Sequence, residues 1–179
     1  IYAGVSEAMT NCMHHAYEGE NLPDACRKWW MFSREDATSG RLQVVFCDLG
    51  IGIPKSLFRE SDQVKKDWFD RLKKFLASHI ALGRRNDDAL KIEAAIEIGQ
   101  TRTKLQHRGK GLKQMVSTLD QIGEGDALVE IISGNGMYRH CAENKKVVEK
   151  ALPLSDNRKT AIRGTLIHWS VPLPKREAE

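Results

Sequence analysis

The sequence predicts a domain of the α/β class, in which helices pack against a β-sheet. Apolar residues recur at helical spacing near the start of the chain and again between Asp62 and Leu82. Short apolar runs bounded by turn residues, which are typical of strands, lie between and after these segments. The chain has 179 residues, of which 41% are hydrophobic. This is enough for one well-buried core, so we expect residues 1–179 to form a single domain.

The first predicted element is a helix over Tyr2–Glu18. Its apolar residues follow the i, i+3, i+4 spacing of one buried stripe, made of Val5, Ala8, Met9, Cys12, Met13 and Ala16. The opposite face is polar and carries Glu7, Asn11, His14, His15 and Glu18. One face of this helix therefore suits a core, and the other is available to a ligand or to solvent.

A β-hairpin is predicted after this helix. Its strands are Arg27–Arg34 and Arg41–Asp48, and the residues between Asp36 and Gly40 are typical of a hairpin connection. The second strand contains the nearly continuous apolar run from Leu42 to Cys47. We therefore expect it to be a central strand.

The middle of the chain is predicted to be helical and its end to form strands. Helices are expected at Asp62–Leu82, Asp87–Ile98 and Gly111–Ile122, and strands at Ala127–Ser133, Gly136–His140 and Thr165–Pro172. The residues Glu143–Arg163 are expected to form a polar excursion without a strand. The stretch Lys55–His107 is long for a connection, so we expect a lid or an insertion above a site.

Charge and cysteine usage narrow the class of protein. The formal charge is +4, and basic pairs such as Lys73-Lys74 and Arg84-Arg85 alternate with acidic residues on predicted helices. This pattern is typical of a solvated face, and direct binding of nucleic acid is the less favoured alternative. The four cysteines form no CxxC pair, which indicates reduced thiols in a cytoplasmic protein rather than disulfides or a zinc site. No apolar run approaches the roughly 20 residues that cross a bilayer, so no membrane association is expected.

Glu7 and Asn11 are the first candidates for chemistry. They are four residues apart and therefore neighbours on one helix face, which His14 and His15 continue one turn later. An amide oxygen can bind Mg²⁺, and a carboxylate can orient or deprotonate a nucleophile. The alternative is an ordinary amphipathic helix with a solvated side.

The second candidate is the segment Asp48-Leu49-Gly50-Ile51-Gly52-Ile53-Pro54, directly after the apolar strand. Asp48 can accept a hydrogen bond from an exocyclic amine, and glycines let the backbone approach a flat ligand. The segment differs from a dinucleotide fingerprint because a third glycine and an immediate helix are absent. The alternative is a plain turn after a buried strand.

The third candidate is Arg108-Gly109-Lys110-Gly111-Leu112, at the start of a predicted helix. The free backbone N–H groups of a helix start favour phosphate, and two basic side chains lie beside them. No GxxxxGK[ST] sequence is present, which excludes a P-loop. The alternative is a flexible helix entry without a ligand.

Together with Gly164-Thr165 at the last predicted strand, these segments resemble the N, G1, G2 and G3 boxes of the GHKL superfamily. That group includes histidine-kinase ATP domains, type II topoisomerases, mismatch-repair ATPases and bacterial anti-sigma serine kinases. The segment from Glu7 to Tyr17 is especially similar to the N-box of the anti-sigma and histidine kinases. The order and spacing of the four blocks add to the specificity of each.

The resemblance implies the Bergerat ATP-binding fold, an α+β two-layer sandwich with a mixed, mostly antiparallel sheet and helices on one face. It implies ATP and Mg²⁺ as ligands, with Asn11 on the metal, Asp48 on the adenine amine and Thr165 supporting adenine through water. The nucleotide-binding residues would be Asn11, His14, His15, Asp48, Gly50, Gly52, Ile53, Arg108, Gly109, Lys110, Gly111, Leu112 and Thr165.

Glu7 matches the general base of the ATP-hydrolysing and serine-phosphorylating branches, whereas histidine kinases commonly carry asparagine there. His14 takes the place often held by a phosphate-contacting lysine. A phosphoacceptor histidine is not predicted, because His79 lies between the G1 and G2 boxes. Members of the superfamily carry elements before the N-box helix, so we expect the chain to be part of a longer protein.

Two functions are therefore expected. The first is ATP hydrolysis or phosphoryl transfer with Glu7 as the catalytic base. The second is a switch, in which bound ATP orders a lid and alters an interface without turnover. In either case we expect a protein partner or an attached domain of the same polypeptide.

Overall fold

The computed structural model of the chain describes residues 2–58, 66–98, 127–143, 146–154 and 161–173. Two of the predicted features lie outside the described residues, namely the loop Arg108–Leu112 and the helix Gly111–Ile122. The fold below therefore concerns the remaining parts of the sequence.

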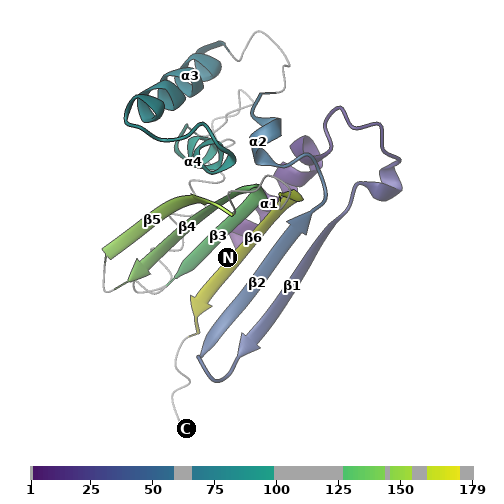
Figure 1. Cartoon of the computed structure of the whole chain (residues 1–179). Helices are drawn as coiled ribbons and strands as arrows, with labels where there is room; N and C mark the ends of the chain where they lie inside the picture. Colours follow the sequence, from purple (N-terminus) through teal and green to yellow (C-terminus); the bar gives the residue numbers. More distant parts are fainter. Residues whose placement is uncertain (1, 59–65, 99–126, 144–145, 155–160, 174–179) are drawn as a thin grey trace.

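The centre of the fold is a six-stranded sheet (Figure 1). In sheet order its strands are β1 (Trp29–Asp36), β2 (Arg41–Asp48), β6 (Ile162–Pro172), β3 (Leu128–Gly134), β4 (Gly136–Glu143) and β5 (Lys146–Pro153). Each described pairing of neighbouring strands is antiparallel, so the sheet is antiparallel rather than mixed in the part of the chain that the structure describes. The strand predicted at Arg41–Asp48 is confirmed, and it lies inside the sheet between β1 and β6.

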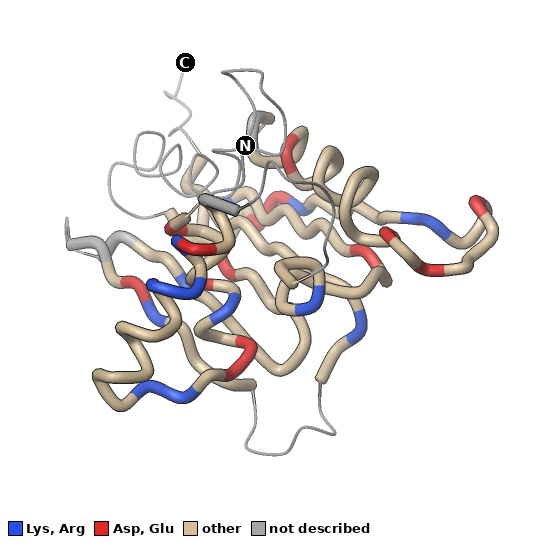
Figure 2. Tube along the Cα trace, turned by 90° about the horizontal axis from the view of Figure 1, so that it is seen from above, with Lys and Arg blue, Asp and Glu red and all other residues tan. Residues whose placement is uncertain are grey.

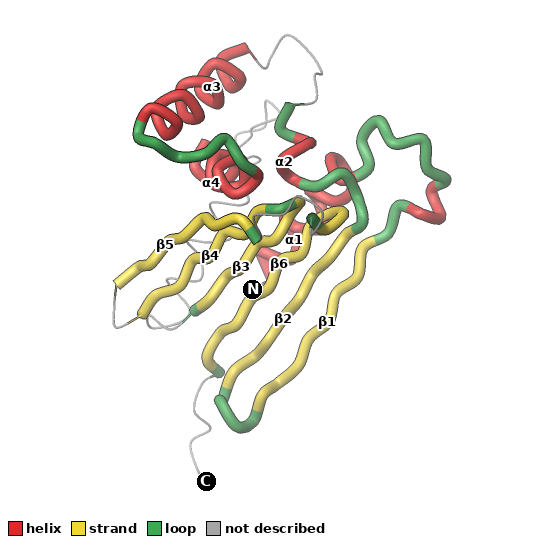
Figure 3. The backbone as a smooth tube through the Cα atoms, viewed as in Figure 1, coloured by secondary structure: helices red, strands yellow, loops and turns green. Residues whose placement is uncertain are grey.

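Helices cover one face of this sheet (Figure 3). The first is α1 (Tyr2–Asn11), which continues as the π-helix η1 (Cys12–Ala16), and the second is α4 (Asp88–Ile98). Their buried residues join alternate residues of the strands in one hydrophobic cluster, which includes Ala8, Cys12, Phe46, Ile92, Ile96, Ile131, Ile167 and Trp169. The predicted α+β two-layer sandwich with helices on one face is thus confirmed.

Helix α3 (Lys66–Ala81) packs on the outer side of α4. A second cluster joins Leu72 and Leu76 of α3 to Leu90 and Ala94 of α4. Because α4 contacts the sheet on one side and α3 on the other, it has buried apolar residues on both sides, namely Ala89, Leu90, Ile92, Ala94, Ala95 and Ile96. The part of the predicted lid that contains α4 is therefore a layer of the core.

The residues Glu143–Arg163 were predicted as a polar excursion, and this prediction is wrong for β5. This strand pairs with β4 from Gly136↔Pro153 to Glu143↔Lys146. It lies at the edge of the sheet, and its charged residues, such as Glu149 and Lys150, interrupt the alternation that would have marked it as a strand. The first strand also begins later than predicted, at Trp29 rather than Arg27.

The start of α4 is fastened by two consecutive aspartates. The Leu90 N–H donates to Asp87 Oδ1 at 2.9 Å, which makes Asp87 the N-cap, and the Asn135 N–H donates to Asp88 Oδ2 at 2.9 Å. The second contact ties the helix start to the turn between β3 and β4. An added Cβ at Gly136, the first residue of β4, would lie 2.5 Å from the Ala89 nitrogen, so only glycine fits there.

We expect Asp87→Ala to lower the free energy of unfolding by about 1 kcal/mol, because it leaves a backbone donor of the first turn without its cap. Asp87→Asn keeps an acceptor at the same position and should cost only a few tenths of this. Urea denaturation followed by circular dichroism measures both. Equal losses for the two variants would contradict the assigned cap.

Candidate functional site

The predicted helix Tyr2–Glu18 changes its winding directly after Asn11. Helix α1 ends at this residue, and Cys12–Ala16 form a π-helix. Such insertions are rare and occur frequently at functional sites. Here the wider turn meets the loop after β2, because the Ile51 N–H donates to the Ala16 carbonyl oxygen at 2.7 Å. The segments predicted as N and G1 boxes are therefore in direct contact.

The glycines of the loop after β2 allow this contact. An added Cβ at Gly50 would lie 2.1 Å from the Ala16 carbonyl oxygen. Gly52 has φ +80°, and an added Cβ there would lie 2.7 Å from Ser133 Oγ. Both glycines are thus required by the protein's own packing, whereas the sequence suggested only the approach of a ligand.

Two further side chains hold the same loop. The Tyr17 hydroxyl donates to the Lys28 carbonyl oxygen and accepts from the Leu49 N–H at 3.2 Å. The Arg163 guanidinium donates to the Leu49 carbonyl oxygen at 2.9 Å and to a Glu20 carboxylate oxygen at 2.6 Å. The loop is therefore fastened to segments that lie before β1 and at the start of β6.

Asp48, the last residue of β2, is buried, with 6% of its surface exposed. Its carboxylate accepts a hydrogen bond from the Gly50 N–H at 2.8 Å and another from the Thr165 backbone. Burial raises the pKa of this carboxyl above its ordinary value of 3.8, and the two hydrogen bonds oppose the rise. A carboxylate is buried in this way where it serves a specific partner, which makes Asp48 a candidate site residue.

Thr165 lies directly opposite Asp48 in the pairing of β2 with β6. The two side chains are thus neighbours on the helix-covered face of the sheet. Thr165 is buried, and its hydroxyl lies 3.1 Å from Ser133 Oγ. Asp48 and Thr165 were both predicted from the sequence, and the fold brings them together.

Ser133 was not predicted as a site residue. Its side chain is fully buried, donates to the Gly164 carbonyl oxygen at 2.8 Å and accepts from the Ile53 N–H at 2.9 Å. It thus joins the loop after β2 to the first residues of β6. Ser133 continues the alternation of the buried residues Val129 and Ile131 along the strand. A hydroxyl at such a buried position was the signal in the sequence that could have identified it.

The donors and acceptors of the Ser133 and Thr165 hydroxyls determine which hydrogen bonds Thr165 can form with a ligand. A serine hydroxyl has one proton to donate, and that of Ser133 goes to the Gly164 carbonyl oxygen. The hydrogen bond between the two hydroxyls therefore has Thr165 as its donor. Thr165 Oγ1 keeps its lone pairs, and Asp48 offers a carboxylate beside it. The pair is a set of acceptors, which is complementary to an amine and not to a carbonyl group.

The other predicted residues of the first helix differ in exposure. Glu7, Asn11 and His15 are half-buried, whereas His14 is exposed. The rings of His14 and His15 are 6.1 Å apart. Asn11 directly precedes the π-helix whose end contacts the loop of Asp48. The predicted phosphate-binding residues Arg108 to Leu112 lie outside the described part of the chain.

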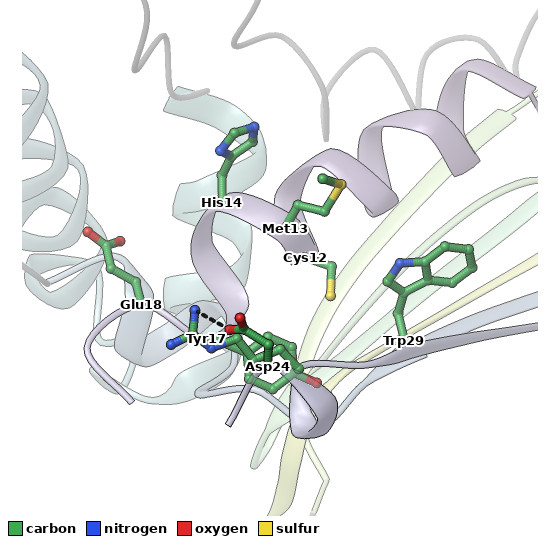
Figure 4. A pocket seen from close by; sticks show the side chains of 8 residues that line it. Cys12, Met13, His14, Tyr17, Glu18, Asp24 and Trp29 are labelled. Atoms are coloured by element: carbon green, nitrogen blue, oxygen red, sulfur yellow. Dashed lines mark ion pairs between the residues drawn. The ribbon is translucent and has the colours of Figure 1, made fainter. Parts of the chain in front are cut away.

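A pocket of about 450 Å³ lies between η1 and the start of β1 (Figure 4). It is lined by Cys12, Met13, His14, Tyr17, Glu18, Asp24, Arg27 and Trp29, and Asp24 and Arg27 form an ion pair of 3.5 Å within it. Of the predicted site residues it includes His14 alone. Burial raises the pKa of the Cys12 thiol to about 12, so this lining residue is protonated at neutral pH.

Basic and acidic residues are interspersed along the described chain (Figure 2). Within the described ranges, no cluster of three or more histidine, cysteine, aspartate or glutamate side chains could hold a metal ion. Nor does any helix in this part of the chain have the length and apolar character needed to span a membrane.

Comparison of the chain with protein-family models and with curated proteins finds no match. The candidate site is thus defined by its own geometry, with Asp48 and Thr165 side by side and a glycine loop docked on the end of the first helix.

Proposed function

We propose that this chain is an ATP-binding domain of the GHKL type, which hydrolyses Mg-ATP or transfers its terminal phosphoryl group. The observation that carries the proposal is the pair of buried acceptors, Asp48 and Thr165, at adjacent strand ends. Adenine carries an exocyclic amine, which donates to such acceptors. Guanine and hypoxanthine carry a carbonyl oxygen at the same ring position and would place an acceptor against these acceptors.

The contact between the first helix and the loop after β2 supports the assignment of the remaining residues. Because the Ala16 carbonyl oxygen binds the Ile51 N–H, a ligand at Asp48 lies beside the end of the helix that carries Glu7 and Asn11. In the proposal, Glu7 removes a proton from a water molecule or a hydroxyl group. His14 and His15 extend the same helix and serve the phosphates.

Asn11 suits Mg²⁺ through its amide oxygen. Magnesium keeps several waters and needs only one or two protein oxygens when it also binds phosphates, so a single amide is a sufficient protein ligand. The bound ion would neutralise charge on the phosphates. Arg108, Gly109, Lys110, Gly111 and Leu112 are proposed to bind the phosphates through backbone N–H groups and basic side chains. When the phosphoryl group goes to a protein hydroxyl, that acceptor belongs to a partner protein or an attached domain.

The proposal is tested first with ligands that differ at one position. Inosine triphosphate has an oxygen in place of the adenine amine and otherwise retains the purine and the triphosphate. Calorimetric titration should show ATP binding about 5- to 150-fold tighter than inosine triphosphate, because a mismatched hydrogen bond in a buried site costs about 1–3 kcal/mol. Equal affinities for the two nucleotides would overturn the adenine assignment.

Two substitutions in the first helix separate binding from turnover. Glu7→Gln should keep ATP affinity and reduce phosphate release by about 100-fold or more, because it removes the base. Asn11→Ala should weaken the dependence of ATP affinity on Mg²⁺. Glu97→Gln makes the same chemical change at an exposed glutamate of α4 and should leave turnover unchanged. A wild-type chain that binds ATP without turnover would favour the switch function.

A further inference from the structure

The two edges of the sheet differ in a way that the proposed nucleotide site does not explain. The strand β5 carries the features that keep an edge strand from pairing with another chain, namely Lys146, Lys150 and a terminal Pro153. The strand β1 at the other edge contains neither lysine nor proline. Its register with β2 also runs from Trp29↔Asp48 to Asp36↔Arg41 without a shift, so no bulge turns it away. Figure 1 shows β1 as the outermost strand on its side.

The apolar residues of β1 are exposed at this edge. The six middle residues of the strand are all exposed. Among them, Trp30 has 38%, Met31 47% and Phe32 61% of its surface accessible. Trp30 and Phe32 pair with Cys47 and Val45, which places them on the face of the sheet opposite to α1 and α4. A long, regular and apolar edge strand is a template for a further strand.

We propose that β1 pairs antiparallel with the β1 of a second copy of this chain, which joins the two sheets into one. The charges along the strand are complementary to such a partner. Lys28 precedes the apolar residues, and Glu35 and Asp36 end the strand. An antiparallel copy therefore brings the basic start of each strand to the acidic end of the other, as the two-fold symmetry of a homodimer requires.

The same charges determine the register. Two residues that lie opposite each other in the joined sheet have their side chains on the same face. Since side chains alternate between faces along a strand, a two-fold axis perpendicular to the sheet pairs residues whose numbers sum to an even number. With the axis at Phe32, the two Phe32 side chains face each other. The flanking pairs are Trp30 with Arg34, a cation–π pair, and Lys28 with Asp36, an ion pair.

Neighbouring registers are less favourable. With the axis at Met31, Lys28 lies opposite Arg34, and like charges directly opposite each other are destabilising. With the axis at Ser33, Trp30 lies opposite Asp36, and the ion pair is lost. The arrangement centred on Phe32 is thus the one in which every outward pair on this face is attractive.

Sedimentation equilibrium of the whole chain tests the proposal. The wild type should have twice the mass of one chain, and Phe32→Lys, which places two lysines against each other, should have the mass of one chain. Leu152→Lys is the matched control, because Leu152 is also exposed and lies on the β5 edge. It should remain a dimer. Far-UV circular dichroism spectra that match the wild type show that both variants keep the fold, whereas the melting temperature of Phe32→Lys should fall with the loss of the dimer. A monomeric wild type, or a dimeric Phe32→Lys, would overturn the self-pairing.

Disulfide cross-linking tests the register independently. In a background with the exposed Cys26 changed to serine, Phe32→Cys places two thiols opposite each other and should give a covalent dimer under mild oxidation. Ser33→Cys lies on the other face and opposite Met31, so its two thiols are too far apart to bond. Cross-linking of Ser33→Cys as efficient as that of Phe32→Cys would refute the register. A monomeric chain that captures a strand of another protein would assign this edge to that protein instead.

Discussion

Asp48→Asn is expected to weaken ATP binding by about 100-fold, which corresponds to about 2.7 kcal/mol. The reason is the orientation that the new amide must take. The Gly50 N–H and the Thr165 backbone both donate to the Asp48 carboxylate. The asparagine carbonyl oxygen must satisfy these donors, so its NH₂ group is left to face the donating amine of adenine.

The control for this variant uses the ligand as well as the protein. With an NH₂ group at position 48, the preference for ATP over inosine triphosphate should disappear or reverse, because the amide donates to the inosine carbonyl. Asp70→Asn makes the same change on the exposed side of α3 and should alter neither affinity. If Asp48→Asn kept the ATP preference of the wild type, Asp48 would not contact the base.

Because the pKa of Asp48 is raised, its contributions to the free energy of unfolding and to ATP affinity should change with pH in opposite directions. Because burial raises its pKa, the folded state binds this proton more tightly than the unfolded state. The contribution of Asp48 to the free energy of unfolding is therefore greatest at low pH, and it is lost as the pH rises from 3.8 through the folded pKa. ATP affinity should change in the other direction and weaken as the carboxylate is protonated. Denaturation and titration of the wild type and Asp48→Asn at several pH values measure both trends, which the variant should lack.

Gly164→Ala is expected to lower the free energy of unfolding by about 4 kcal/mol, a large share of the roughly 5–15 kcal/mol of a typical domain. Gly164 has φ +81°, which an alanine adopts only with strain. In addition, its Cβ would lie 2.0 Å from the Asp48 carbonyl oxygen and 2.8 Å from the Leu49 Cα. These are backbone atoms of the loop after β2, which the Ala16, Tyr17 and Arg163 contacts hold in place, so they cannot move aside easily.

Gly83 provides a control with nearly the same φ angle. It has φ +84° at the end of α3, and an added Cβ would meet nothing within 4 Å. Gly83→Ala should therefore cost only the conformational strain, about 1 kcal/mol. Chemical denaturation of both variants separates strain from overpacking. Similar losses for the two would show that the close approach of Gly164 to Asp48 does not limit stability.

The helices and strands of the core could be predicted from the sequence wherever burial makes apolar residues recur at a regular spacing. The bounds of β2 were predicted without error, because its apolar run ends at an aspartate followed by glycines. The helical spacing of apolar residues between Asp62 and Leu82 likewise matches α3, in which Leu72 and Leu76 are buried. Edge strands could not be predicted as well. Solvent on their outer side tolerates charged residues, so β5 was missed and β1 was placed two residues early.

The candidate site was only partly predictable. Asp48 was identified from its position at a strand end before two glycines, whereas Thr165 was identified only through the resemblance of Gly164-Thr165 to the fourth GHKL box. Ser133 was missed because a single serine at the end of an apolar run has no distinctive pattern. Its importance arises from Ile53 and Gly164, which are far from it in the sequence and meet it only in the folded chain.

By itself the sequence determined the class of the fold and the bounds of the central strand β2, with Asp48 at its end. Period and composition are local properties, and they are sufficient for these conclusions. Only the tertiary structure decided that the first helix widens after Asn11, that Gly50 and Gly164 are needed by neighbouring backbone, and that α4 belongs to the core. Each of these depends on the distance between atoms that the chain brings together from remote positions, and no local pattern encodes such a distance.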